Sequence, residues 1–238
     1  MFSIDDMILA IMHPRRIKSV IESINRIDYI DIVLAKNMLI VDAINSLKSF
    51  ALDHGYKYMI LTSDDLIIPY EACLRLYEDI LLHGFKVITG YSRIKPSSLD
   101  LNITEKEIYD LDRKLNRPVF YHEYRFLRVH DVLSYLQKGI YIIPVFFVGW
   151  SLTAIEQSVL KKWKPRGWFI DKILINNKYY TWHVSVDLHF SYTIRKMGIQ
   201  AYCDLTVYAP HLAVRLETMR IGLEKPQVEF RKKRKSIF

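Results

Sequence analysis

The sequence predicts an α/β fold, in which a mostly parallel central sheet carries helices on both faces. Short apolar runs alternate four times with amphipathic stretches between residues 7 and 91, and this order is typical of a parallel sheet. The chain has 238 residues, of which 50% are hydrophobic and 25% are charged. That composition is typical of a globular protein with one large domain or two small ones.

The first half of the chain contains the expected strands at short spacing. We expect a strand where a run is short and apolar, and a helix where apolar residues recur every three or four positions. Pro69 suits the first turn of a helix, and Gly84 follows the end of that helix. The expected elements are strands at residues 7–12, 29–34, 58–62 and 86–91, and helices at residues 15–24, 37–53 and 69–83.

The pattern becomes less regular after Pro96. Residues 97–116 are polar and charged, which predicts a loop or an exposed helix, and residues 119–127 alternate weakly, as in an antiparallel strand. Residues 139–155 carry no charge, but the run is shorter than the roughly 20 residues of a membrane-spanning helix. We expect buried strands around a turn there. The remaining expected elements are helices at residues 151–163 and 186–198 and a strand at residues 200–207.

Charge and cysteine content indicate the setting of the protein. The net charge is +8, and five of the last eight residues, from Arg231 onward, are lysine or arginine. This basic tail is either a solvated, frayed terminus or a contact with an anionic membrane surface or nucleic acid. Cys73 and Cys203 are too few for a disulfide framework, and the acidic N-terminus does not resemble a signal peptide. We expect a cytoplasmic protein that the tail could hold at a membrane.

Two adjacent acids, Asp64 and Asp65, follow the third expected strand. Ligands of parallel sheets bind beyond the carboxyl ends of the strands, so these acids belong to the edge where ligands bind. The acids would either cap the next helix or bind a divalent cation. The sequence has neither GxGxxG nor GxxxxGK, so the phosphates of a bound nucleotide would need another counter-charge, such as Mg²⁺ or Mn²⁺.

Several short motifs follow one another in a characteristic order. They are His13-Pro14-Arg15-Arg16, Lys36-Asn37, Ala43-Ile44-Asn45, Ser63-Asp64-Asp65, the run SVDLHFSYTIRKMGIQAYCD from Ser185, and His211-Leu212. Together they resemble the inverting, metal-dependent glycosyltransferases of the GT-A fold, close to the large family 2. The similarity covers roughly residues 7–212, with residues 97–137 unmatched. Similar small proteins occur in viruses of thermophilic archaea.

The resemblance implies that a sugar moves from a nucleotide-diphosphate donor to an acceptor hydroxyl on a protein, glycan or lipid. It also implies a role for each matched residue. The general base would be Asp187, and the acceptor would be bound by Gly149 and Trp150. The metal ion, Mn²⁺ or Mg²⁺, would be held by Asp65 and His211. The donor would be bound by His13, Pro14, Arg15, Lys36, Asn37, Asp64 and Asp65. Residues 1–95 would bind the nucleotide sugar, residues 96–215 would complete the same domain, and residues 216–238 would form the basic tail.

Each of these residues also has a structural explanation. Asp187 could be a first-turn helix acid stabilised by the helix dipole, His211 an ordinary hydrogen-bonded histidine, and Trp150 a core aromatic. Ser63 replaces the first acid of the family motif. No acid follows the second expected strand, so the base of the donor nucleotide cannot be identified. The alternative functions are a nucleotidyltransferase, a nucleic-acid- or membrane-binding protein acting through the tail, and a related fold without activity.

Overall fold

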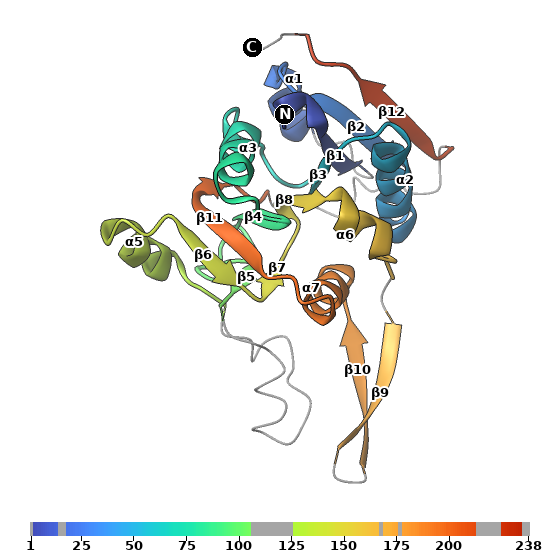
Figure 1. Ribbon diagram of the computed structural model, residues 1–238. Coiled ribbons are helices and arrows are strands. Elements are labelled where there is room, and N and C mark those ends of the chain that lie inside the picture. The colour runs from blue at the N-terminus through green and yellow to red at the C-terminus, as the bar shows by residue number, and fades with distance from the viewer. Residues whose placement is uncertain are drawn as a thin grey trace.

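The computed structural model describes residues 2–13, 18–105, 126–166, 169–175, 178–212 and 225–234 (Figure 1). Its centre is an eight-stranded mixed sheet with the strand order β12-β2-β1-β3-β8-β4-β11-β6. The strands are β1 (Met7–His13), β2 (Asp31–Lys36), β3 (Tyr58–Ser63), β4 (Val87–Tyr91), β6 (Ile142–Val145), β8 (Ser151–Glu156), β11 (Ala201–Tyr208) and β12 (Gln227–Arg231). The expected segments 1–95, 96–215 and 216–238 therefore all contribute strands to this one sheet.

Parallel pairing dominates the middle of the sheet. Strand β1 is parallel to β2 and β3, and β4 is parallel to β11. Strand β8 lies antiparallel between β3 and β4, so these two share one direction. The outer strands β12 and β6 are antiparallel to their neighbours. The carboxyl ends of β2, β1, β3, β4 and β11 consequently meet at one edge, where the sequence predicts ligand binding.

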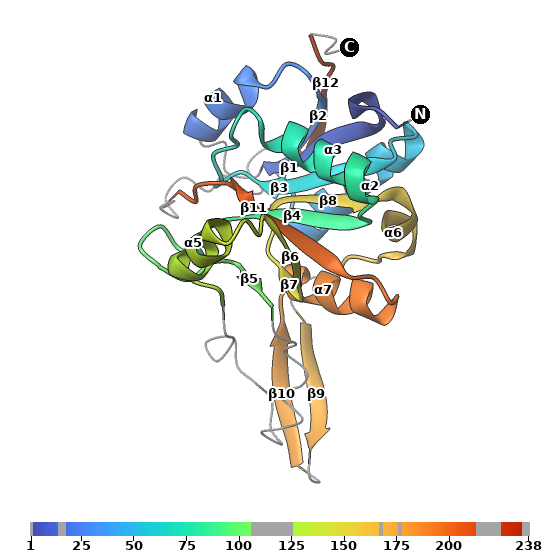
Figure 2. The same ribbon diagram turned by 60° about the vertical axis from the view of Figure 1, so that its left-hand side comes forward.

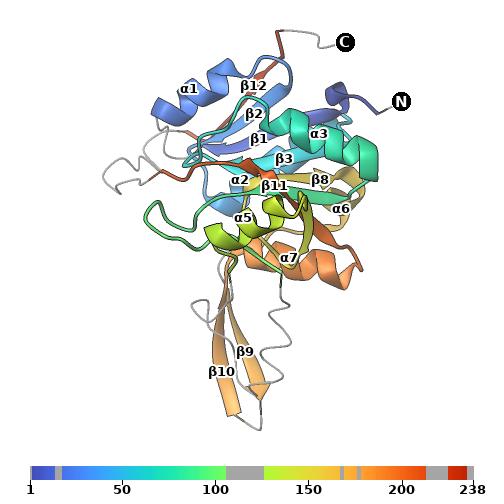
Figure 3. The same ribbon diagram turned by 90° about the vertical axis from the view of Figure 1, so that its left-hand side faces the viewer.

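Helices cover both faces of the sheet, as predicted (Figures 2 and 3). They are α1 (Lys18–Arg26), α2 (Ile40–Asp53), α3 (Ala72–His83), α5 (Val129–Gln137), α6 (Gln157–Lys162) and α7 (Val186–Lys196). One buried cluster joins α2, α6 and α7 to alternate residues of β1, such as Ile8 and Ala10. A second cluster joins α1 and α3 to the intervening residues Leu9 and Ile11. Side-chain alternation along the strands thus divides the core into two layers.

Two small antiparallel sheets lie outside the central one. Strand β5 (Ile103–Thr104) pairs with β7 (Phe147–Val148), and Ile103 is opposite Val148. Strands β9 (Phe169–Ile175) and β10 (Lys178–Val184) form a hairpin that projects from the body of the protein (Figures 1 and 2). Among the described residues, no helix is long and apolar enough to cross a membrane.

The expected strand–helix order of the first half is confirmed, and so are the buried strands within residues 139–155. The helix predicted at residues 151–163 is wrong in its first part, because Ser151–Glu156 form β8 and only Gln157–Lys162 are helical. Five consecutive residues of β8 are buried between β3 and β4. A strand covered on both faces has no polar side, so its period of two cannot be seen in the sequence.

The basic tail is more ordered where it is described than a frayed terminus would be. Strand β12 pairs with β2 along its whole length, from Gln227 opposite Lys36 to Arg231 opposite Ile32. The amide of Lys233 donates to Asp31 Oδ1 at 2.8 Å, and its ammonium pairs with Asp5. Most of the antiparallel strand predicted at residues 119–127 lies outside the described residues.

Candidate active site

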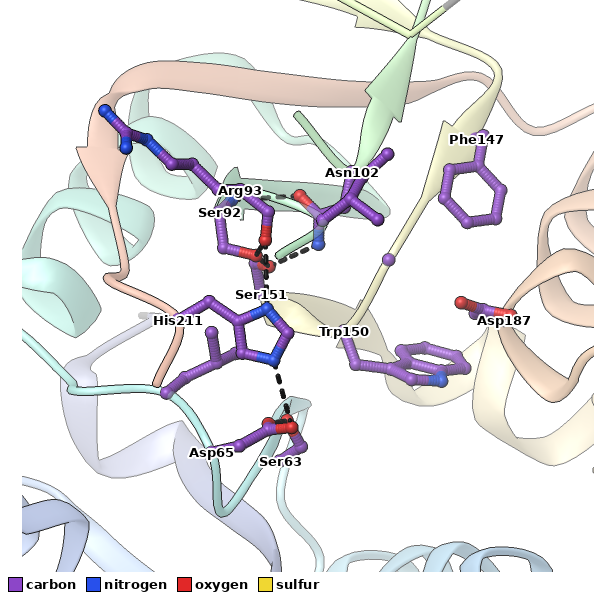
Figure 4. Close-up of a pocket in the computed structure, with 13 residues that line it drawn as sticks. Ser63, Asp65, Ser92, Arg93, Asn102, Phe147, Trp150, Ser151, Asp187 and His211 are labelled. Atoms are coloured by element: carbon purple, nitrogen blue, oxygen red, sulfur yellow. Dashed lines mark hydrogen bonds and ion pairs between the residues drawn. The ribbon is translucent and has the colours of Figure 1, made fainter. Parts of the chain in front are cut away.

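A pocket of about 200 Å³ opens at the carboxyl ends of β3 and β4 (Figure 4). Its walls come from segments far apart in the sequence: the end of β3, the residues after β4, the β7–β8 turn and the first turn of α7. Figure 4 shows Asp65 and His211 on one side of the pocket and Asp187 on the other, with Trp150 between them. The structure thus brings together Asp65, Gly149, Trp150, Asp187 and His211, all of which the sequence predicts as site residues.

Asp65 and His211 form a bonded pair. His211 Nε2 lies 3.1 Å from Asp65 Oδ2, its Nδ1 lies 3.0 Å from the Arg93 carbonyl oxygen, and Ser63 donates its hydroxyl to Asp65 Oδ1. The bond to Asp65 raises the pKa of His211 above its ordinary value. The backbone holds the pair in place, because the Leu212 amide donates to the Asp65 carbonyl at 2.8 Å.

The two adjacent acids have different environments. Asp65 lines the pocket with 16% of its side chain exposed, whereas Asp64 is fully buried at 0% and does not line the pocket. The expected contact between Asp64 and the donor therefore has no counterpart in this pocket. Of the two adjacent acids, only Asp65 places its carboxylate in the pocket, where it lies beside His211.

Asp187 lies in the first turn of α7, which Ser185 caps by accepting the Leu188 amide at 3.4 Å. The Asp187 carboxylate accepts a hydrogen bond from the Ser185 hydroxyl and another from the Leu188 amide at 2.8 Å. Burial raises the pKa of Asp187, although both hydrogen bonds oppose this effect. A carboxylate with a raised pKa accepts a proton more readily. Asp187 therefore lies at a helix terminus, lines the pocket and has a raised pKa.

Trp150 is at once a core residue and a pocket residue. Its ring centroid lies 5.0 Å from that of Phe190 and 5.5 Å from that of Trp163. This aromatic cluster fixes the indole while the residue still lines the pocket. Its exposed surface can stack on a sugar ring. The two interpretations of Trp150 are thus compatible.

Five polar residues of the pocket were not predicted as site residues: Ser63, Ser92, Arg93, Asn102 and Ser151. Asn102 belongs to the stretch that the family resemblance does not cover, so no motif identifies it. Ser151 owes its position to a bulge in β8. Thr153 pairs with Leu61 and Ser151 pairs with Thr62, while Leu152 between them has a φ of 65°. Bulges of this kind redirect side chains next to functional sites.

Among the described residues, the predicted donor residues Lys36 and Asn37 do not line the pocket. Lys36 pairs with Glu229 of β12, and Asn37 Nδ2 donates to the Lys225 carbonyl at 3.2 Å. His13 ends β1 opposite Lys36, whereas Pro14 and Arg15 lie outside the described residues. Lys36 and Asn37 lie at the carboxyl end of β2, on the same side of the sheet as the pocket. Their side chains contact Glu229 and Lys225 of the C-terminal segment.

The residues around Asp65 suit a cation that is shared with a ligand. In the described part of the chain, no group of three or more His, Cys, Asp or Glu side chains could hold a metal by itself. Asp65 and His211 offer one carboxylate and one imidazole, 3.1 Å apart. Mg²⁺ is often held by one or two carboxylates plus substrate phosphates. The pair therefore fits a cation that also binds a diphosphate.

Comparison with known proteins shows the fold alone. No family model and no curated protein matches the chain. Among solved structures, it is similar to "Crystal Structure of A197 from STIV", a protein of a thermophilic archaeal virus. The TM-score is 0.55 and the identity 16%, over 87% of this chain and 86% of that chain. The α/β class with a mixed central sheet is therefore supported, together with a distant likeness to one such viral protein.

Proposed function

We propose that the protein is a glycosyltransferase of the GT-A type. It would move a sugar from a nucleotide-diphosphate donor to an acceptor hydroxyl, with inversion and with Mn²⁺ or Mg²⁺. The observation that supports this best is the convergence of Asp65, His211 and Asp187 on one pocket at the strand ends. These residues come from separate motifs of the resemblance, and a purely structural role for each would not require a common cavity.

In this proposal Asp187 starts the reaction by accepting the proton of the acceptor hydroxyl. The hydroxyl oxygen forms a bond to the anomeric carbon while the bond from that carbon to the diphosphate oxygen breaks. The bonding electrons leave with the nucleoside diphosphate, and Asp187 later releases its proton to water. Attack from the face opposite the leaving group inverts the configuration. The position of Asp187 across the pocket from Asp65 and His211 supports this direction (Figure 4).

Asp65 and His211 would hold the donor diphosphate through the cation. A bound cation neutralises negative charge on a departing diphosphate. Ser63 would orient the Asp65 carboxylate through its hydroxyl, and the Arg93 carbonyl would orient the imidazole through Nδ1. Groups that orient metal ligands in this way commonly strengthen metal binding. Trp150 would provide a flat surface for the sugar.

Thermal unfolding with a panel of sugar nucleotides, each with and without Mn²⁺, tests the proposal. One nucleotide sugar should raise the unfolding temperature only when Mn²⁺ is present. At one hundred times its dissociation constant, a ligand adds about 2.7 kcal/mol to the free energy of unfolding. The anomeric configuration of the product, determined by NMR, then tests inversion. If no sugar nucleotide changes the unfolding temperature with either Mn²⁺ or Mg²⁺, the proposal is wrong.

A further inference from the structure

The side-chain amide of Asn102 is held in a single orientation at the pocket wall. Its Oδ1 accepts the Ser92 backbone N–H at 2.9 Å, and its Nδ2 donates to Ser151 Oγ at 2.5 Å. A backbone N–H can only donate, so the oxygen must face Ser92 and the nitrogen must face Ser151. The backbone of Asn102 is held too, because its N–H donates to the Ser92 carbonyl at 3.0 Å.

The direction of the neighbouring hydrogen bonds follows from that orientation. Because Ser151 Oγ accepts from Asn102, its own hydrogen goes to Ser92 Oγ at 2.8 Å. Ser92 then donates to the Arg93 carbonyl at 3.3 Å, the same carbonyl that lies 3.0 Å from His211 Nδ1. A continuous hydrogen-bond network therefore connects Asn102 with the pair formed by His211 and Asp65. Networks in which the members satisfy one another are rigid.

Asn102 keeps hydrogen-bonding capacity for a ligand. An amide offers two N–H donors and two acceptor lone pairs, and the described residues use one donor and one lone pair of this side chain. Asn102 lines the pocket, and Figure 4 shows it beside Ser92 and Ser151, above both His211 and Asp187 in this view. A hydroxyl group can use both the remaining donor and the remaining acceptor site of this amide, whereas an ionised phosphate can use only the donor.

Gly149 makes room for this amide. A Cβ atom at Gly149 would lie 2.6 Å from Asn102 Nδ2 and 3.0 Å from Asn102 Cβ. The Gly149 amide also donates to the Asn102 carbonyl at 3.1 Å. A side chain at residue 149 would therefore displace the amide of Asn102. Gly149, which also lines the pocket, thus leaves the space that the Asn102 amide occupies.

We propose that Asn102 is a specificity-determining residue that binds a hydroxyl of the transferred sugar. The inference rests on the proposed function, which places the sugar between the diphosphate at Asp65 and the base Asp187. A preoriented amide recognises a hydroxyl strongly, because an analogue without that hydroxyl leaves polar groups of the site unpaired. The residue would thus select among sugars rather than act on the reacting bond.

Steady-state kinetics of Asn102→Ala with the preferred donor and its deoxy analogues tests this. The wild type should reject one deoxy analogue strongly, and the variant should use that analogue about as well as the parent donor. For the parent donor, kcat/KM should fall about 10-fold, mainly through KM. Thr89→Val is the control, because it removes a buried hydroxyl that is bonded to Thr153 at 2.9 Å in the same sheet and does not line the pocket. It should lower thermal stability without changing donor preference.

A double-mutant cycle with Gly149→Ala adds a second readout. In the otherwise wild-type protein, Gly149→Ala should cause the same loss of donor discrimination as Asn102→Ala. In the Asn102→Ala background, Gly149→Ala should have a much smaller effect. Equal effects of Gly149→Ala in both backgrounds would contradict the positioning role of Gly149. If the wild type transfers sugar but Asn102→Ala keeps its discrimination, the inference alone is wrong. If the wild type binds no sugar nucleotide, both the inference and the proposed function are wrong.

Discussion

Two parts of one sheet edge, both expected to bind the donor, differ in what covers them. At the end of β3, Asp65 lines an open pocket with His211 and lies across from Asp187. At the end of β2, Lys36 pairs with Glu229, and Asn37 bonds the carbonyl of Lys225. Both parts satisfy the rule that ligands bind at the carboxyl ends of parallel strands. The difference teaches that a position at a strand end does not by itself make a side chain available to a ligand.

The largest expected effect concerns the pocket. Asp187→Asn keeps the size of the side chain but removes the proton acceptor, so we expect the transfer rate to fall about 10²–10⁴-fold. Metal-dependent binding of the donor should persist, because Asp65 and His211 are unchanged. Rate assays and calorimetry measure the two quantities separately. Asp100→Asn is the control, because Asp100 is partly exposed and pairs with Arg128 at 3.2 Å. A fully active Asp187→Asn variant would remove Asp187 as the base.

The raised pKa of Asp187 predicts how the transfer rate depends on pH. The carboxylate must be deprotonated to accept a proton, so the rate should increase with pH until Asp187 is fully ionised. The midpoint should lie above the range of an ordinary aspartate, because burial disfavours the charged form. A rate profile that is flat from pH 4 upward would contradict this assignment.

The adjacent acids provide the next test, because only one of them lines the pocket. Asp65→Asn should weaken metal-dependent donor binding by at least about 10–100-fold, since even the loss of an outer partner of a metal ligand can cost that much. Asp64→Asn should instead lower the free energy of unfolding by about 1–3 kcal/mol, because Asp64 is fully buried. Calorimetry and chemical denaturation distinguish the two effects. Equal losses of donor affinity would show that both acids bind the ligand.

Much of the fold could be predicted, because local patterns determine it. The strand–helix alternation between residues 7 and 91 identified the first four strands, and strand ends identified the edge that carries Asp65. Three features depend on contacts between distant segments and could not be predicted. Strand β8 is buried on both faces, Asn102 reaches the pocket from an unmatched stretch, and β12 covers Lys36 from near the C-terminus. Sequence patterns identify chemical groups more readily than they identify what covers them.

A raised pKa does not by itself distinguish a catalytic carboxyl from a structural one, and Asp79 provides the comparison. Burial and the neighbouring Asp204 raise the pKa of Asp79 to about 7, and Asp79 does not line the pocket. Between about pH 4 and pH 7 the folded protein keeps a proton that the unfolded chain releases. The free energy of unfolding should therefore decrease as the pH rises through this range.

Asp79→Asn should remove this pH dependence and leave the transfer rate unchanged. Above pH 7 the variant should be more stable than the wild type, because the wild type then carries a partly buried charge beside Asp204 that the amide lacks. The gain should be only roughly 1–2 kcal/mol, because partial exposure screens that charge. Denaturant titrations at several pH values measure the difference. If Asp79→Asn lowers activity while Asp187→Asn does not, the catalytic assignment has to move from the pocket to the contact between α3 and β11.

The smallest effect is expected at the covered end of the sheet edge. The hydrogen bond from Lys36 lowers the pKa of Glu229, so this carboxylate is charged at neutral pH and would compete with the anionic donor of the proposed reaction for the ammonium group. Glu229→Gln should strengthen donor binding about 3–5-fold and lower the free energy of unfolding by at most about 1 kcal/mol, as is usual for a partly exposed pair. Glu22→Gln, which removes an exposed pair with Lys18 at 3.7 Å, is the matched control. Calorimetry should show a gain in donor affinity for Glu229→Gln and none for Glu22→Gln. An unchanged affinity in Glu229→Gln would mean that Lys36 stabilises β12 and does not bind the donor.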